Sequence, residues 1–444
     1  MTVDRLRARF AAAASAALLF CGPAALAQAP APSLDAAARQ AAVQAAASRL
    51  RERYVFPDVG AQAAEKIEKA LASGAYDQIS DPQTFADRLT ADLREVTKDK
   101  HLNIRATGPQ RPPAGPPGPP PPRSEGGVVR ADRLTGGIGY VEVAAFPPPG
   151  VFKPAVDRAL AGLKDAPALI IDLRRNGGGS PQSVAYLVSH FVDPAKPMLI
   201  NEFFDRRAGS TEYDKKASMS VPTPISLRGK PVYVLTSART FSGGEEFAYD
   251  MQAFKLGVLV GETTGGGANP GGGGPLTPQF AMFTPDARPV NPVTKTNWEG
   301  VGVKPDIAVP AGEALKTALQ KLGQAPEDGA VETLSQARLF TPRTTPQPGS
   351  ESAVRVLAEG LASGAPKYEA MTPDVAQITR DQLASLKPQF AGLGAIQSIS
   401  FASVGPAGMD RYELKGATGS MVVAIFLDAG GKVAGVGLEP PRPH

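Results

Sequence analysis

The stretch LIIDLRRNGGGS, residues 169–180, is the best starting point for interpreting the chain. Its first three residues form a short apolar run that is typical of a buried strand. Three glycines follow at 177–179, and the apolar spacing of residues 183–191 then indicates a helix. A glycine turn between a strand and a helix is where an α/β fold exposes backbone N–H groups that favour negative charge. Such turns are also common as plain tight turns, so this stretch alone leaves both interpretations open.

Length and charge limit the class of protein. The chain has 444 residues, which is enough for two or three domains with a sizeable core. Its net charge is +4, from 47 basic and 43 acidic residues, and the charges are interspersed rather than gathered in long runs. We therefore expect no nucleic-acid partner and no binding to an anionic membrane surface.

The N-terminus has the three parts of an export signal. Three arginines within residues 5–9 precede an apolar run at 10–20, and Ala25-Leu26-Ala27 forms an A-x-A cleavage site. A Gly-Pro pair interrupts the run before it reaches the roughly 18 residues that a membrane anchor needs. The sequence therefore predicts a signal peptide at 1–27 and an exported mature chain without a membrane span, most simply periplasmic, with secretion or lipid attachment at Cys21 as alternatives. Cys21 is the only cysteine, so a processed chain would have no disulfide and no thiol nucleophile.

The remaining chain divides by pattern into an α/β region flanked by two smaller units. Apolar residues recur at helical spacing before residue 97, and strand and helix signals alternate through the middle of the chain. Helical patterns precede strand patterns near the C-terminus. We predict a helical domain at 34–105, a Pro-rich loop at 106–130, an α/β core at 131–312, a helix and linker at 313–350, and a non-catalytic α+β domain of cystatin-like type at 351–440.

Only three histidines occur, and one of them stands in a functional context. His444 is the last residue, and His190 lies within the predicted helix after the glycine turn, where a structural role is the common one. His101 follows Asp99 at a predicted loop-to-strand step, and loops carry functional residues more often than core positions do.

Ser242 is the candidate nucleophile. It follows a predicted strand at 231–237 and begins a helix, in the stretch Thr240-Phe241-Ser242-Gly243-Gly244-Glu245. A serine there is usually a helix N-cap, and Glu245 would complete a capping box. A nucleophile needs the same place, with its hydroxyl exposed and the N–H of Gly243 directed at an oxyanion. The local pattern is compatible with both roles.

These segments together resemble the tail-specific (C-terminal-processing) peptidase family. They are most similar to the branch that contains interphotoreceptor retinoid-binding protein, tricorn core protease and the chlamydial protease-like activity factor. The resemblance covers roughly residues 50–310 and rests on five motifs in family order: Tyr54-Val55-Phe56-Pro57, Asp99-Lys100-His101-Leu102, Asp172-Leu173-Arg174 with Asn176-Gly177-Gly178-Gly179, Thr240-Phe241-Ser242, and Trp298-Glu299-Gly300-x-Gly302-Val303-x-Pro305-Asp306.

The resemblance implies an α/β fold with a crotonase-like ββα core after a helical unit. It also implies that Ser242 is the nucleophile, that His101 is its base and that Glu299 orients the histidine. Many family members use a lysine about 25 residues after the serine instead, but that region here, residues 261–267, has none. The segment between His101 and the first core strand is also too short and too rich in proline for the PDZ domain found in many members.

The sequence thus predicts a serine endopeptidase that acts on protein or peptide substrates, with the N–H groups of Gly243 and Gly178 as oxyanion donors. Two alternatives stay open: a non-catalytic binder of apolar, retinoid-like or lipid-like ligands, and an esterase or amidase. No cofactor is expected, because no Gly-Lys-Ser/Thr follows the glycines at 265–274. A catalytic metal is not expected either, because the histidines are scattered and no His-Glu-x-x-His occurs.

Overall fold

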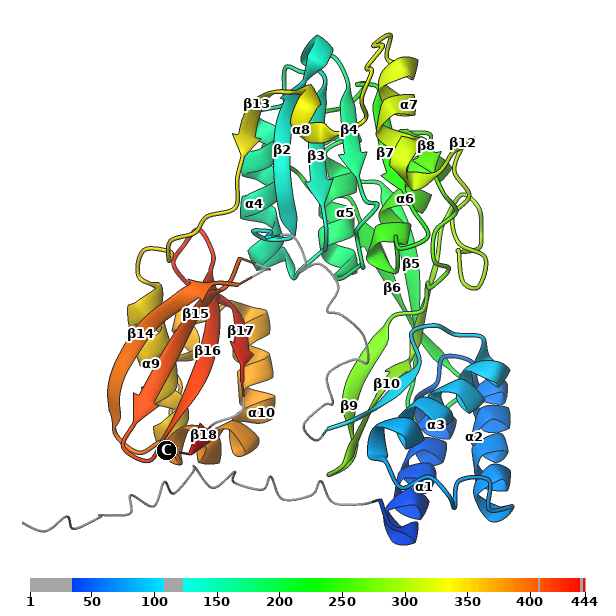
Figure 1. Cartoon of the computed structure of the whole chain (residues 1–444), viewed down its shortest axis with the longest axis vertical. Coiled ribbons are helices and arrows are strands. Elements are labelled where there is room, and N and C mark those ends of the chain that lie inside the picture. The colour runs from blue at the N-terminus through cyan, green and yellow to red at the C-terminus, as the bar shows by residue number, and fades with distance from the viewer. Residues whose placement is uncertain (1–33, 108–122, 406–407, 440–441, 444) are drawn as a thin grey trace, which may run out of the picture.

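The computed structural model describes residues 34–107, 123–405, 408–439 and 442–443. The predicted signal peptide, Cys21, most of the Pro-rich loop and His444 lie outside these residues. Figure 1 shows a central α/β body, a helical unit at the N-terminal side and a separate C-terminal body. The expected mixed α/β class is confirmed.

A seven-stranded sheet forms the centre of the α/β body, with the order β12-β8-β7-β4-β3-β2-β13. The strands β3, β4, β7, β8 and β12 run parallel to one another, while β2 and β13 are antiparallel to their neighbours. The strands are β2 (Val128–Leu134), β3 (Gly139–Val143), β4 (Leu169–Asp172), β7 (Val232–Thr236), β8 (Val258–Gly261), β12 (Ile307–Ala308) and β13 (Ser335–Phe340).

Helices cover both faces of this sheet, which explains the continuous apolar run in β4. Leu169 and Ile171 pack in the core beneath one set of helices, and Ile170 packs on the opposite face against α7. The helices are α4 (Pro149–Ala161), α5 (Pro181–Ser189) and α6 (Gly243–Ala253) on the first face, and α7 (Ala314–Lys321) on the second, followed by the single turn α8 (Val331–Leu334).

The N-terminal unit is completed by a hairpin from the α/β body. Its three helices are α1 (Ala36–Arg53), α2 (Pro57–Ala72) and α3 (Pro82–Thr97), and they lie in the part of the chain with apolar residues at helical spacing. Strand β1 (Asn103–Ala106) pairs with β10 (Phe280–Pro285), which pairs with β9 (Gly271–Thr277). Phe280 and Met282 enter the core between the helices, so this hairpin ties the helical unit to the α/β body beside β1 (Figure 1).

A third sheet has the order β11-β5-β6 and was not predicted. Its strands are β5 (Leu199–Arg206), β6 (Tyr213–Met219) and β11 (Ala287–Val290). Most side chains of β5 and β6 are exposed or half-buried, so the alternating apolar pattern that identifies a strand is absent.

The C-terminal body has helices first and strands after them, as predicted. Helices α9 (Ser350–Ser363) and α10 (Pro373–Ala391) pack on a sheet of β14 (Ile396–Val404), β15 (Asp410–Gly416), β16 (Gly419–Leu427) and β17 (Val433–Leu438), with β18 (Arg442–Pro443) beside β16. The segment predicted as a helix and linker contains one more strand, β13, which joins the edge of the central sheet. Only Phe340 of β13 is buried, so its pattern carries little strand signal.

Candidate active site

Ser242 stands in a strained turn between β7 and α6. Its backbone has φ 54° and ψ −122°, a conformation that is rare for a residue with a side chain and that is found at functional sites. A strand–turn–helix with a strained serine at its tip presents the hydroxyl outward, as in nucleophile elbows. Ser242 is half-buried, and with Glu245 it forms the capping box expected at the start of α6. The position is therefore compatible with both roles considered for this serine, helix N-cap and nucleophile.

Glu245 fixes this turn to the loop at 264–269. Its fully buried carboxylate accepts hydrogen bonds from the backbone N–H groups of Ser242 (2.9 Å), Gly266 (2.6 Å) and Gly267 (2.8 Å) and from the Thr264 hydroxyl (2.5 Å). Burial raises the pKa of Glu245, and these donors counteract the shift. Glu245 thus supplies its half of the expected capping box and also holds a third loop against the serine.

The glycine turn after β4 lies directly against Ser242. A Cβ added to Gly178 would come within 2.5 Å of the Ser242 Cβ and 2.9 Å of the Gly243 nitrogen, so only glycine fits there. The Gly178 N–H donates to Asn176 Oδ1 at 2.8 Å. In this structure it is therefore engaged within its own turn and is not the free oxyanion donor that we expected.

Asn176 and Gly179 complete this turn. Asn176 is fully buried, and its Nδ2 donates to the Val143 carbonyl at 2.9 Å. The Gly179 nitrogen lies 3.1 Å from the position that a Cβ on Gly243 would occupy. Among the described residues, neither Gly179 N–H nor Gly243 N–H has a hydrogen-bond partner. Two free backbone donors therefore flank Ser242.

His101 reaches this turn from the N-terminal unit. It lies two residues before the start of β1, whose pairing with β10 places Asn103 opposite Phe283. The His101 ring packs on Phe241, the residue before Ser242, with ring centroids 4.7 Å apart, and stacks on Phe283 at 6.1 Å. Both ring nitrogens are buried and, among the described residues, have no hydrogen-bond partner. The imidazole is thus held by aromatic packing and leaves both nitrogens free.

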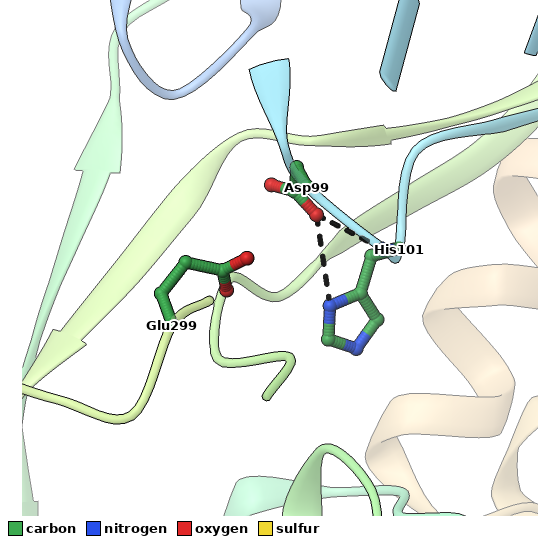
Figure 2. Close-up of side chains that lie close together, drawn as sticks. All are labelled: Asp99, His101 and Glu299. Carbon is green, nitrogen blue, oxygen red and sulfur yellow. Dashed lines mark hydrogen bonds and ion pairs between the residues drawn. The ribbon is translucent and has the colours of Figure 1, made fainter. Parts of the chain in front are cut away.

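Glu299 and Asp99 lie beside His101 (Figure 2). One ligand atom from each of the three side chains lies within 4.8 Å of the other two. Asp99 Oδ1 accepts the His101 backbone N–H at 2.9 Å and lies 3.9 Å from His101 Nδ1. Figure 2 shows Nδ1 on the side of the ring that faces Asp99 and Nε2 on the far side. Asp99 belongs to one of the sequence motifs, but no role was predicted for it.

The two carboxylates are held in different ways. Glu299 Oε2 accepts the N–H groups of Ala268 (2.5 Å) and Asn269 (3.1 Å), whereas its buried Oε1 has no partner among the described residues. Asp99 Oδ2 accepts from Asn269 Nδ2 at 3.0 Å and from the Tyr54 hydroxyl at 3.3 Å. The Asn269 residue therefore links both carboxylates, and nothing in the sequence pattern had singled it out.

Burial sets the protonation of this cluster. Burial, reinforced by the nearby charge of Asp99, raises the pKa of Glu299 to about 7. Burial also lowers the pKa of His101 below its usual range, although Asp99 acts in the opposite direction. The site therefore favours a neutral imidazole, which is the form that a general base needs.

Neither His190 nor Lys100 contributes its side chain to the cluster of Asp99, His101 and Glu299. His190 is fully buried, with Nδ1 3.0 Å from the Tyr186 carbonyl and Nε2 3.3 Å from Asp157 Oδ1, which fits the structural role considered for it. Lys100 points its ammonium at the Gly265 carbonyl, 2.5 Å away. Within the described part of the chain, no helix is long and apolar enough to cross a membrane.

A cavity of about 620 Å³ opens beside the site. Its lining includes Pro181 and Gln182, which follow the glycine turn, and Pro270 and Gly271, which follow Asn269. The β5–β6 hairpin forms the other side. Although Ser242 and His101 do not line it, the cavity begins at the two loops that flank them.

Comparisons with known proteins find matches to the N-terminal unit and to the α/β body. A model of peptidase family S41 matches residues 137–309, and a model described as the N-terminal domain of peptidase S41 in eukaryotic IRBP matches residues 25–126. Solved structures with a similar chain path include a protein of Parabacteroides merdae described as a peptidase (22% identity, TM-score 0.47, covering 66% of this chain and 95% of that one). They also include the photosystem II D1 C-terminal processing protease (15%, 0.42, 64% and 95%) and the tricorn protease (14%, 0.40, 65% and 36%).

The two family models follow one another along the chain in the order of the motifs, and they enclose every residue of the candidate site. The chain therefore belongs to peptidase family S41 and is a serine peptidase.

Proposed function

We propose that the chain is an exported serine endopeptidase that cleaves peptide bonds with Ser242 as nucleophile, His101 as general base and Glu299 as the carboxylate that orients the base. The observation that carries this proposal is the strained backbone of Ser242 at the start of α6, with a free N–H on the following residue and an unpartnered imidazole packed on the preceding one. The crotonase-like description of the core and the cystatin-like description of the C-terminal body belong to the same proposal.

In the acylation step, His101 accepts the Ser242 proton while Oγ attacks the substrate carbonyl. The proton passes to the ring, and the ring later returns it to the leaving amine. Nε2 is the nitrogen suited to this task because it lies on the side of the ring away from Asp99 (Figure 2). Nδ1 then carries a hydrogen directed toward the carboxylates, which stabilise the imidazolium that forms.

The tetrahedral oxyanion is stabilised by backbone donors at the start of α6. We assign the N–H of Gly243 to this role, as expected from the sequence. We assign the second donor to the N–H of Gly179, because the Gly178 N–H is engaged by Asn176. Each such donor contributes about 3 kcal/mol to the transition state.

The neighbouring cavity supports a peptide as the substrate. It has both charges on its wall, with Arg53, Lys153 and Lys216 beside Asp205 and Asp286. A mixed polar wall suits a peptide chain with its amide groups and varied side chains better than it suits a retinoid or a lipid tail. The cavity therefore supports a peptidase better than it supports a binder of apolar ligands.

The test uses the mature chain, a fluorophosphonate probe and a peptide library read by mass spectrometry. The probe is expected to label Ser242, and Ser242→Ala is expected to lose labelling and at least about 10⁴-fold of peptide hydrolysis while unfolding at the same temperature. Full hydrolysis by Ser242→Ala would refute the assignment. Turnover of simple esters without any peptide cleavage would favour the esterase or amidase instead. Processing after Ala27 and recovery of the chain in the periplasmic fraction would test export.

A further inference from the structure

The cluster of Asp99, His101 and Glu299 has an unusual charge balance. Two carboxylates lie beside one imidazole, and Asp99 is only 1% exposed. Among the described residues, neither carboxylate forms an ion pair with a lysine or an arginine. Buried carboxylates are normally paired with a cation or bound to a metal. Neither carboxylate of this cluster is therefore neutralised by direct contact with a lysine or an arginine from the residues that the structure describes.

The cluster also has unused ligand atoms. Both nitrogens of His101 and the Oε1 atom of Glu299 are buried without a hydrogen-bond partner among the described residues. Leaving such atoms unpaired costs free energy, and each one in a folded protein calls for an explanation. In this case three unpaired atoms belong to two side chains that lie next to one another.

We propose that Asp99, His101 and Glu299 bind a divalent transition-metal ion, zinc by preference, and that the bound ion switches the peptidase off. One imidazole nitrogen and two carboxylate oxygens are a donor set that suits zinc, whereas magnesium and calcium prefer oxygen ligands alone.

The spacing of the three side chains fits such an ion after a small adjustment. Ligands at about 2.0–2.2 Å from a tetrahedral zinc ion lie about 3.3–3.5 Å from one another. His101 Nδ1 and Asp99 Oδ1 are 3.9 Å apart, and one ligand atom from each of the three residues lies within 4.8 Å of the others. A modest rotation of the imidazole and of the Glu299 carboxylate brings the ligands into range. Asn269 and Tyr54, which hold Asp99, would orient that ligand.

Inhibition follows from the tautomer of the imidazole. A neutral imidazole has one proton and one lone pair. When zinc binds the lone pair of Nδ1, the proton resides on Nε2, which then cannot accept the Ser242 proton. The metal also neutralises the carboxylates that would stabilise the imidazolium. The inhibition by zinc rests on the proposed function, whereas the binding of zinc does not.

Binding is tested without turnover. The sample is the mature, untagged Ser242→Ala chain, titrated with zinc in a calorimeter and with cobalt(II) in a spectrophotometer. We expect one zinc ion per chain and the visible absorption of four-coordinate cobalt. Asp99→Asn and Glu299→Gln, made in the same background, should each weaken zinc binding more than tenfold. Two variants are used so that the result stands if one of them fails to fold.

The matched control is Asp157→Asn. Asp157 also stands beside a buried histidine, but the two nitrogens of His190 already have partners, so this change should leave zinc binding unaltered. Absence of zinc binding by the folded Ser242→Ala chain at 1 mM, or binding that Asp99→Asn and Glu299→Gln leave unchanged, would overturn the inference.

Inhibition is then measured on the unmutated chain. Zinc should abolish peptide hydrolysis over the concentration range in which it binds, EDTA should restore it, and magnesium and calcium should have no such effect. Zinc that binds at the cluster while hydrolysis continues would overturn the switch. If the chain binds zinc as described but never cleaves a peptide, the proposed function fails while the metal site stands.

Discussion

Two histidines among the described residues, His190 and His101, each lie beside an aspartate, yet their ring nitrogens differ in hydrogen bonding. His190, at the end of α5, is fully buried and has both nitrogens within hydrogen-bond distance of Tyr186 and Asp157. His101, in the loop before β1, has both nitrogens free and is held by aromatic rings. A histidine with two partners contributes to folding, whereas one held in place without partners keeps its lone pair and proton available for chemistry.

The clearest way to break this comparison is to remove each histidine in turn. His101→Ala is expected to lower kcat/KM for a peptide substrate by about 10⁴-fold, because members of a catalytic unit act together. His190→Ala should stay within tenfold of the unmutated chain at a temperature where it remains folded. The measurement is steady-state hydrolysis of one fluorogenic peptide by both variants. Equal losses in both variants would contradict the distinction.

The next effect concerns pH. Glu299 has its pKa raised to about 7 by burial and by Asp99, so we expect kcat/KM to rise as pH increases through about 7, where the carboxylate becomes charged and can stabilise the imidazolium. Glu299→Gln should lower kcat/KM by about 10²-fold and remove that limb of the profile. If the rise of kcat/KM near pH 7 persists in Glu299→Gln, the titrating group is a residue other than Glu299.

The same pKa predicts a change in stability. The folded state holds the Glu299 proton more tightly than the unfolded chain does. The protonated carboxyl therefore stabilises the folded state at low pH, and this stabilisation is lost as pH rises from about 4.5 to about 7. Glu299→Gln should therefore gain stability relative to the unmutated chain over this window, by at most about 3 kcal/mol. Urea unfolding at both ends of the window measures the difference.

Much of the fold was predictable because its elements carry strong periodic patterns. The three N-terminal helices bury apolar residues at helical spacing, and the strands β3, β4, β7 and β8 are short, largely buried runs. The hairpin β9–β10 was missed because β9 has the sequence GGGGPLT, which has almost no strand propensity. Its strand conformation is imposed by pairing with β10, which is a tertiary effect that local sequence does not contain.

The sequence motifs named the residues of the candidate site but not the contacts between them. Ser242, His101 and Glu299 were singled out by motif, yet the contact between His101 and Phe241 depends on the unpredicted pairing of β1 with β10. The direction of the Gly178 N–H could not be predicted either, because it depends on the orientation of one peptide plane, which the Asn176 side chain fixes. Asp99 offered one signal that could have been used, since an aspartate two residues before a loop histidine readily accepts its backbone N–H.

Removal of His190, the histidine with two partners, is expected to destabilise the fold. His190→Ala removes a fully buried ring and leaves the Tyr186 carbonyl without its partner, so we expect a loss of about 2–4 kcal/mol in the free energy of unfolding. His101→Ala removes two unpaired buried nitrogens and should cost less. Urea denaturation of both variants at one pH gives the two values, and a larger loss for His101→Ala would reverse the interpretation of which histidine supports the fold.

The smallest effect sharpens the comparison with a second buried pair of carboxylates. Glu246 and Asp250 lie one turn apart on α6, and Asn201 Nδ2 donates to each at 3.1 Å. Burial raises the pKa of Glu246 to about 8 and that of Asp250 well above its usual value. These side chains resemble His190 in having partners, so we expect them to affect stability and not the chemistry.

For Glu246→Gln the sign is fixed by the raised pKa. The unmutated chain loses stability as pH rises from about 4.5 toward about 8. The reason is that the unfolded chain releases the Glu246 proton near pH 4.5, whereas the folded state holds it until about pH 8. A glutamine in its place carries no proton to lose and keeps an oxygen for the Asn201 amide. Its stability relative to the unmutated chain should therefore increase by about 1–3 kcal/mol between pH 5 and pH 8.5, with kcat/KM within a few fold. Glu65→Gln, at an exposed position on α2, is the control. An unchanged difference across this pH range, together with a large loss of hydrolysis, would mean that a buried cluster whose carboxylates have hydrogen-bond partners takes part in the chemistry. Hydrogen-bond satisfaction would then no longer separate structural from functional groups in this protein.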